Sequence, residues 1–428
     1  MKISIRRISS ILFILSCILG MTVEIKYIDT ITIPYWFTYL AIVFSCLLGI
    51  AIESKGIVTR TSIIGMGLIT AYLLLYILIS RYNTERYITA FVFFIILFYL
   101  YSYLMQRNGH FGDFIYTFAD VVMIIGVISL FFWLFGSVLR VLPGRVETTY
   151  SFAKWQHLKT YTYYYLYFEN PIQNQKLLGI DIPRNCGIFT EAPAYSGLLL
   201  YAYGIHVFGP KEMDKKKVLL LLITILSTQS TKALIILIMV FGIRFMFEGN
   251  ENHSKVYVFI KTLVSILMIV VSIAVIESIM SDKMIANDSF IARVNHLNGG
   301  LKTWLQNPFF GAGFENDNAF FSNLNSGAGE NGMSMGLTVL LAYGGIYLTL
   351  FYIFAIFVAT KNRSVKGNLK NYCFFVLMLL VNLFISNSAF GYPYLFFVAS
   401  GYAAGTHNGL NNREVRNNLR IMHRRFAK

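Results

Sequence analysis

The sequence has few charged residues, few cysteines and few prolines. Asp, Glu, Lys and Arg together make up 13% of the 428 residues, whereas 56% are hydrophobic. Soluble domains carry about 25% charged residues, so this composition excludes an ordinary soluble globular protein. The mean hydropathy of +0.59 is typical of a chain that is solvated largely by lipid.

The four cysteines exclude a disulfide framework. Three of them, Cys17, Cys46 and Cys373, lie in apolar runs, and Cys186 stands alone in a polar segment. Disulfide frameworks and metal sites need cysteines or histidines at short, recurring spacings, and this sequence has none. We therefore predict neither disulfides nor a bound metal.

The basic residues do not indicate a nucleic-acid partner, although the net charge is +15. They lie between apolar runs and do not interleave with aromatic residues in a soluble module. Most of the 36 Lys and Arg residues fall between alternate runs, on the side that holds the N-terminus. This distribution follows the positive-inside rule for membrane proteins.

Apolar runs long enough to cross the hydrocarbon core recur along the whole chain. They predict an all-α polytopic protein of the cytoplasmic (inner) cell membrane, with about 12 transmembrane helices. We expect a single membrane domain over 1–428, with both termini cytoplasmic and a basic cytoplasmic tail over 408–428 that forms an amphipathic helix on the inner leaflet. The predicted spans are 8–24, 34–52, 62–80, 87–105, 115–139, 193–209, 216–230, 232–248, 256–277, 334–359, 371–389 and 391–407.

The first apolar run has the outline of a signal peptide, with basic residues before it. Residues 20–24 lack a small-x-small cleavage site, and further spans follow at once. We therefore expect the run to be retained as the first helix.

Two connections are long, 140–192 and 278–333, and both fall on the extracytoplasmic side of the predicted map. Binding and catalytic residues concentrate in such loops. The first loop carries a basic cluster, from which we name Arg145 as a candidate substrate contact. Anionic ligands held by guanidinium groups would explain this cluster, and a loop solvated by its own charges is the alternative.

Aromatic rings are dense within the first long loop, over 155–168. Amphipathic rings suit a membrane interface and also the flat faces of sugars. We expect an interfacial belt here, because Tyr and Trp are enriched at interfaces without any ligand.

The segment from Arg184 to Pro193 reads Arg-Asn-Cys-Gly-Ile-Phe-Thr-Glu-Ala-Pro and precedes an apolar run. Pro193 marks the first turn of a helix. Glu191 either complements the dipole of that helix or acts as a base on a sugar hydroxyl while Arg184 binds a phosphate. The spacing alone leaves both interpretations open.

This segment resembles the Arg-x-x-Gly-x-Phe-x-Glu-x-Pro motif of the O-antigen polymerase and O-antigen ligase superfamily. Two further stretches match in order. The polar turn from Thr228 to Lys232 is similar to the family's Thr-x-Ser-Arg, and Trp304 to Gly313 is similar to its Trp-(x)n-Pro-(x)2-Gly-x-Gly. The three stretches lie on the expected side of the map, between Arg184 and Gly345.

The resemblance implies inverting, metal-independent glycosyl transfer at the outer face of the membrane, with undecaprenyl diphosphate as the leaving group and no cofactor. It predicts a polymerase of lipid-linked repeat units that forms O-antigen, capsular or exopolysaccharide. Its partners would be the undecaprenyl-diphosphate-linked glycan, membrane lipid, a chain-length regulator and a flippase. The candidate residues are Glu191 and Arg184 for catalysis, Arg184, Lys232 and Arg293 for the diphosphate, and Arg145, Asn318 and Asn331 for the rest of the substrate.

The sequence departs from the family at two positions. Lys232 replaces a second Arg, which keeps the charge but loses the bidentate fork, and a lysine that snorkels to the interface is the alternative. Ligases carry a His at the end of the second long loop, where this chain has Asn331 to Gly336. The missing His argues against a ligase and leaves the role of base to Glu191 or a loop carboxylate, with cationic stabilisation of the diphosphate as the alternative source of catalysis. The loop carboxylates are Glu315, Asp317 and Glu330.

The second long loop is also rich in Asn. Amides suit hydrogen bonding to sugar hydroxyls, and an AT-rich genome is an equal explanation. Gly311 and Gly313 are expected to form a turn, because no strand-to-helix frame surrounds them as in a phosphate-binding loop.

A transporter or lipid flippase is a rival of a different class. It would be expected to carry charges at the centres of its spans and an internal repeat. Here Asp120, Arg244 and Glu277 lie near span ends, and the halves of the sequence show no repeat. A purely structural membrane scaffold is the remaining alternative, and it would leave the motif at Arg184 unexplained.

Overall fold

A computed structural model of the chain describes residues 4–31, 33–54, 59–152, 155–171, 175–177, 180–209, 213–247, 254–284, 288–324, 336–360 and 389–406. The predicted span at 371–389 falls almost entirely outside these residues, and so does the predicted tail at 408–428.

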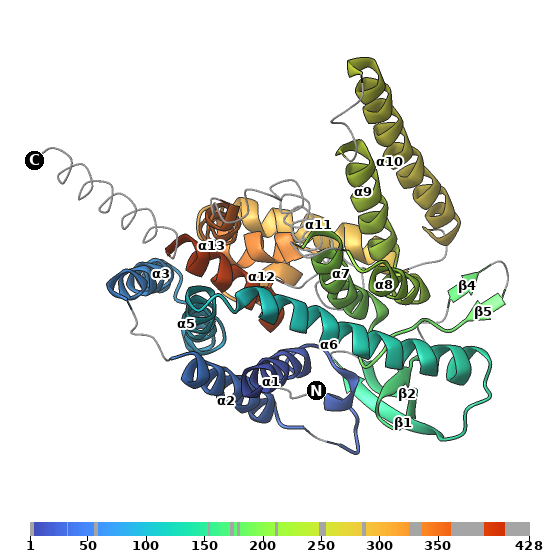
Figure 1. The fold of residues 1–428 in the computed structure, drawn as a ribbon, viewed down its shortest axis with the longest axis horizontal. Coiled ribbons are helices and arrows are strands. Elements are labelled where there is room, and N and C mark those ends of the chain that lie inside the picture. The colour runs from blue at the N-terminus through green and yellow to red at the C-terminus, as the bar shows by residue number, and fades with distance from the viewer. Residues whose placement is uncertain are drawn as a thin grey trace, which may run out of the picture.

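Helices form most of the described chain (Figure 1). α4 runs through a π-helical turn, Tyr87–Val92, into α5, and α6 continues as a π-helix through Phe132–Val138. The helices of the first half are α1 (Ile5–Leu19), α2 (Tyr35–Glu53), α3 (Arg60–Ile79), α4 (Thr84–Arg86), α5 (Phe93–Arg107) and α6 (Phe111–Phe131). Those of the second half are α7 (Ala192–Phe208), α8 (Lys215–Ser227), α9 (Thr231–Phe247), α10 (Lys255–Met284), α11 (Asp288–Gln306), α12 (Asp317–Phe321) and α13 (Gly336–Thr360), followed by helical residues 392–406.

Every predicted span within the described residues coincides with a helix. Five of these helices are long and apolar enough to cross a membrane, which makes the chain a multi-pass membrane protein. They are Tyr35–Glu53, Arg60–Ile79, Thr84–Arg107, Phe111–Val138 and Gly336–Val358. The total of twelve spans and the orientation stay predictions.

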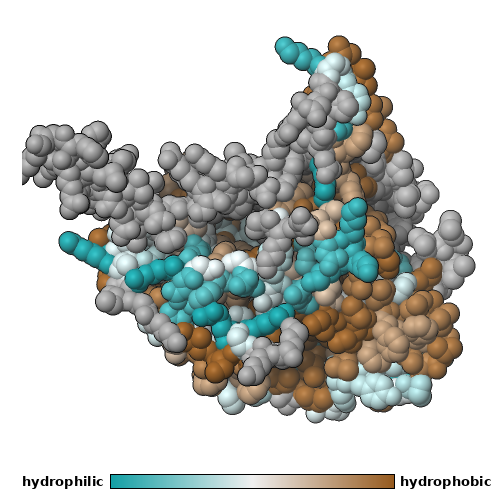
Figure 2. Space-filling model, in the orientation of Figure 1, coloured by the Kyte–Doolittle hydropathy of each residue, from teal (hydrophilic) through white to brown (hydrophobic). Residues whose placement is uncertain are grey.

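The helix α7 lies at the centre of the packing. Its residues from Tyr195 to Phe208 are all buried, because the helix is apolar on every side and contacts α6, α8 and α9. The hairpin of α9 and α10 stands out from the other helices in Figure 1. Apolar side chains such as Phe259, Leu263 and Leu267 are exposed on α10, and Figure 2 shows hydrophobic residues along this projection. Such a surface suits lipid.

The first long loop contains β-strands that the sequence analysis did not predict. β1 (Arg145–Phe152), β2 (Trp155–Tyr163) and β3 (Tyr167–Glu169) form an antiparallel sheet in that order. β4 (Gln175–Leu177) and β5 (Ile180–Ile182) form a separate two-stranded ribbon. The all-α prediction therefore needs correction, and the reason is the run of Thr and Tyr residues, which favours strands over helices.

The aromatic residues of this sheet are not simply an interfacial belt, as the sequence analysis expected. Tyr163, Tyr167 and Phe168 are at most 1% exposed and form part of the protein core. Among the described rings of this sheet, Tyr164 and Tyr165, at the turn between β2 and β3, are exposed. β3 is buried on both of its faces, so the division is between the strands and the turn that joins them.

The second long loop is also more ordered than predicted. Residues 288–306 form the helix α11, and α12 follows it, so most of the described part of 278–333 is helical. α11 packs against α13 and α12. A Cβ on Gly300 would lie 2.8 Å from Thr338 Cβ, and Thr303 Oγ1 donates to Ala319 O at 3.2 Å. These packed positions are small or polar, so no apolar run indicated a helix there.

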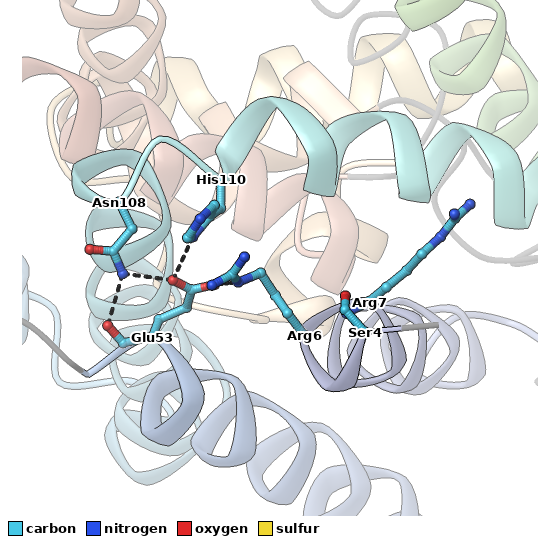
Figure 3. A network of polar contacts seen from close by, with 6 residues as sticks. All are labelled: Ser4, Arg6, Arg7, Glu53, Asn108 and His110. Carbon is cyan, nitrogen blue, oxygen red and sulfur yellow. Dashed lines mark hydrogen bonds and ion pairs between the residues drawn. The ribbon is translucent and has the colours of Figure 1, made fainter. Parts of the chain in front are cut away.

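A polar network joins the ends of α1, α2 and α5 (Figure 3). The buried Glu53 carboxylate pairs with Arg6 Nε at 2.9 Å and with His110 Nδ1 at 3.0 Å. Asn108 Nδ2 donates to Glu53 Oε2 at 2.7 Å and to its carbonyl oxygen at 2.9 Å. All of these residues belong to segments predicted to face the cytoplasm.

Candidate functional site

The segment from Arg184 to Glu191 is held against the connection that follows α1. Glu24 N donates to Ile188 O at 2.9 Å, and Thr190 N donates to Thr22 O at 3.1 Å. The same connection pairs with β1, where Asp29 N donates to Thr149 O at 3.0 Å. Three segments that are far apart in sequence therefore pair through their backbones. Two of them were predicted to lie outside the cytoplasm, and the third begins at the end of the first predicted span.

Arg184 contacts the polar turn between α8 and α9. Its Nε donates to Thr228 O at 3.0 Å. The next residue reinforces this contact, because Asn185 N donates to Ser227 O at 3.1 Å and Asn185 Nδ2 donates to Ser227 Oγ at 2.9 Å. Two of the three motifs found in the sequence thus meet in space.

Lys232 lies in the first turn of α9, directly after this polar turn, and is only 3% exposed. A lysine that snorkels to a membrane interface would place its ammonium group in water. The burial of Lys232 argues against that alternative. Arg184 thus contacts Thr228, and the buried cationic residue Lys232 follows Thr228 by four positions in the chain.

Gly187 is required by the geometry of this segment. Its φ is +59°, and a Cβ at this position would lie 2.9 Å from the ring of Tyr195. Asn185 Oδ1 accepts a hydrogen bond from Gly187 N at 3.0 Å, which closes the turn. The glycine of the motif therefore serves a tight turn against α7.

Glu191 lies at the N-cap position of α7, but its side chain makes no capping hydrogen bond. The carboxylate of an acidic N-cap residue usually accepts a backbone N–H of the first turn. The side chain is half-buried. These facts favour a role for Glu191 other than capping its own helix.

The buried thiol of Cys186 is affected by several charged groups. Burial raises the pKa of Cys186 to about 12, Arg184 lowers that pKa, and Glu24 and Glu191 raise it. A charge must lie close to a group to shift its pKa in this way. Arg184, Glu191 and a second carboxyl group, that of Glu24, thus all act on this thiol, and Glu24 also contacts the segment through its backbone, since its N–H donates to Ile188 O.

Glu24 was missed by the sequence analysis, which placed it at the end of the first span. Its side chain is fully buried, and burial raises its pKa to about 8. The Thr160 hydroxyl, which also donates to Glu169 O at 3.1 Å, lowers the pKa of Glu24, but the effect of burial is larger. An acidic residue at the end of an apolar run was the signal that could have identified it.

Arg145 lies in β1 and has internal contacts. Its Nη2 pairs with Glu169 Oε1 at 2.9 Å, and its guanidinium carbon lies 3.6 Å from the centre of the Tyr161 ring. Ser137 Oγ also donates to Glu169, at 2.9 Å from Oε2. These contacts give Arg145 a role in joining the sheet to α6, and its predicted contact with substrate stays a prediction.

The remaining candidates belong to the second long loop. Asn318 is exposed in α12, the side chain of Arg293 lies outside the described residues, and so do Asn331 and Glu330. Glu315 pairs with Arg86 Nε at 2.6 Å, and burial raises its pKa. Asp317 accepts a hydrogen bond from the Tyr343 hydroxyl. Glu315 and Asp317 thus each contact a structural partner, and their role as a base stays a prediction.

The third motif, Trp304 to Gly313, contacts α13 at a kink in that helix. Gly345 has a φ of +59°, and a Cβ on Gly311 would lie 2.5 Å from the carbonyl carbon of Tyr343. Ala312 N donates to Ala342 O at 2.7 Å, and Ile346 N donates to Pro308 O at 2.9 Å. The expected turn is present, and its glycines permit this close approach of two backbones.

Comparison with known families identifies part of the chain. Residues 218–336 match the model of the Wzy_C family, described as O-antigen ligase. The chain carries a Wzy_C domain. This domain is shared by Wzy polymerases and O-antigen ligases, which are glycan-transferring enzymes, and the resemblance inferred from the motifs is thereby confirmed. A comparison with curated proteins found no matching sequence.

The matched Wzy_C region includes most of α8, all of α9, α10, α11 and α12, and the turn that contacts Arg184, whereas Arg184 and Glu191 precede it. Within the described residues, no group of His, Cys, Asp and Glu side chains could hold a metal ion. The site therefore consists of the Wzy_C turn and the segment that precedes α7.

Proposed function

We propose that the protein is a polysaccharide polymerase that joins undecaprenyl-diphosphate-linked repeat units at the outer face of the cytoplasmic membrane. The observation that carries this proposal is the contact of Arg184 with Thr228. The buried Lys232 follows Thr228 by four positions in the chain. Two cations at this place would stabilise the negative charge that develops on a departing diphosphate.

In the proposed reaction, a hydroxyl oxygen of the acceptor sugar attacks the anomeric carbon of the donor glycan. The bond from this carbon to the diphosphate oxygen breaks, and undecaprenyl diphosphate leaves with the electron pair. Glu191 accepts the proton of the attacking hydroxyl. Attack opposite to the leaving group inverts the anomeric carbon, and the cationic side chains replace a metal ion.

The test is polymer growth by purified protein from lipid-diphosphate repeat units in the presence of a chelator. Arg184→Ala should abolish polymers longer than one repeat, because the leaving diphosphate loses its main cation. In cells, the same variant should display single repeat units without a ladder of longer chains. Arg140→Ala, which changes an exposed arginine of the same loop, should leave the ladder unchanged. A normal ladder from Arg184→Ala would refute the site assignment.

A ligase is the second candidate, because the matched family carries the description O-antigen ligase. A ligase would transfer the glycan to a different acceptor, such as a lipid A core, and would make no repeat-to-repeat bonds. Offering both acceptors to the purified protein distinguishes these two enzymes. A flippase would give no new glycosidic bond with either acceptor.

A further inference from the structure

A cleft opens between the connection of α3 to α4 and the third sequence motif. Its volume is about 580 Å³, and its walls come from residues 79–82, 306–312, 316 and 319. Sites for small ligands usually measure about 300–1,000 Å³. Both walls belong to segments that were predicted to face the outside of the cell.

The base of this cleft is rigid. Gly311 N donates to Asn307 O at 2.8 Å, and Tyr347 N donates to Phe309 O at 2.9 Å, which fixes the motif on the kinked part of α13. Gly313 packs against the opposite wall, where a Cβ would lie 2.5 Å from Tyr82 Cβ. A site held in place in this way loses little entropy when a ligand binds.

Not every polar group of the cleft is available to a ligand. Gln306 and Asn323 exchange hydrogen bonds through their amides, at 3.0 and 3.1 Å. Asn316 Nδ2 donates to Ala312 O at 2.9 Å, and its Oδ1 accepts from Ala319 N at 3.2 Å. These amides therefore shape the walls.

Arg81 and Asn307, in contrast, have polar groups that a ligand could reach. Both side chains are exposed, and among the described residues neither has a side-chain hydrogen bond or an ion pair. The rings of Tyr82 and Phe309 lie on the same cleft and are 42% and 69% exposed. Hydrogen-bonding groups beside exposed rings match a sugar, whose hydroxyls are polar and whose ring face is apolar.

We propose that this cleft, the Arg81 cleft, binds a sugar unit of the lipid-linked glycan, with Arg81 and Asn307 on its hydroxyls and Tyr82 and Phe309 on its ring face. The proposal rests on the proposed function, because it assigns the cleft to the same substrate. It adds the α3–α4 connection to the substrate-binding surface of the protein.

The test measures binding separately from polymerisation. The probe is the repeat-unit oligosaccharide of the producing strain, released from its lipid, and binding to purified protein in lipid nanodiscs is followed by saturation-transfer NMR. We expect Arg81→Ala and Asn307→Ala each to weaken binding about tenfold, the equivalent of about one hydrogen bond. Arg81→Lys should retain part of the affinity.

Two controls make the outcome specific. Arg60→Ala changes an exposed arginine at the other end of α3 and should bind as the wild type does. Arg184→Ala should bind the oligosaccharide normally while polymerisation is lost. Unchanged affinity in the double variant Arg81→Ala/Asn307→Ala, or a wild-type protein that polymerises without binding the probe, would overturn the Arg81 cleft. Normal binding by a protein that forms no glycosidic bond would instead overturn only the proposed function.

Discussion

The contact between Arg184 and Thr228 orients a charged side chain through an uncharged group. A carbonyl oxygen accepts the Nε–H of the guanidinium but contributes no negative charge of its own. This contact therefore positions the arginine without itself neutralising it, as a site for an anion requires. Two other residues of the site can be tested individually: Gly187 for backbone conformation and Glu24 for charge.

Gly187 provides a test of conformation. Gly187→Ala should destabilise the protein by about 1–3 kcal/mol, because a side chain at positive φ is strained and the new Cβ meets the Tyr195 ring. Thermal unfolding of the purified protein in detergent measures this loss. Gly67→Ala in α3, where a Cβ meets nothing within 4 Å, serves as the matched control and should unfold at the wild-type temperature or slightly above.

Glu24 provides a test of charge. Burial raises its pKa from 4.5 to about 8, so between these pH values the folded protein keeps a proton that the unfolded chain releases. The contribution of Glu24 is therefore fully favourable below the lower pKa, and stability falls by up to about 1.4 kcal/mol per pH unit as the pH rises towards the upper one.

Glu24→Gln should remove this pH dependence and stabilise the protein at pH 8 relative to the wild type. Melting temperatures measured from pH 5 to pH 9 would show it. The exposed Glu85 is the control, since Glu85→Gln should leave the slope unchanged. Parallel curves for Glu24→Gln and wild type would contradict the burial of this carboxyl group in its protonated form.

At the scale of secondary structure, Glu53 joins three helix ends. Glu53→Ala should cost about 1–3 kcal/mol, because it removes the acceptor of Asn108 and the partner of Arg6 and His110. The midpoint of thermal unfolding is again the measurement. An unchanged midpoint would mean that water replaces the carboxylate without loss.

The helices were predictable, and the strands were not. Long apolar runs such as 34–52 and 115–139 can only be helical in lipid, because every backbone group must be satisfied within the segment. No such constraint applies to 145–169, where the pairing of Thr148 with Thr160 depends on residues that are not local. The ring-rich composition was therefore interpreted as a membrane belt, although its period of two also fits a sheet.

The candidate site was predictable only in part. The Arg184 motif and the turn at Thr228 could be recognised separately, and their contact was implied only by the family resemblance. Glu24 carried only the signal of an acidic residue at the end of an apolar run, and Arg81 carried none, because each stands in a short connection without any motif. Their proximity to the site or cleft arises from helix packing, which places sequence-distant connections side by side.

For the molecule as a whole, the orientation in the membrane can be measured. The described cysteines, Cys17, Cys46 and Cys186, are buried, so new surface cysteines can be labelled selectively once Cys373, which lies outside the described residues, is changed to Ser. Tyr164→Cys should react with an impermeant maleimide in intact cells, because the sheet is predicted to face outward. Ser54→Cys should react only after the cells are opened. The reverse pattern would refute the proposed outer-face reaction.

The pairing of the α1–α2 connection with the Arg184 segment also constrains how the protein is made. Thr22 and Thr190, which share a hydrogen bond, are 168 residues apart. At a synthesis rate of about 5–20 residues per second, the α1–α2 connection is made roughly 10–30 s before its partner segment. During that interval the backbone groups of this connection that later pair with the Arg184 segment have no partner there. A membrane chaperone or the translocation machinery therefore has a defined segment to protect.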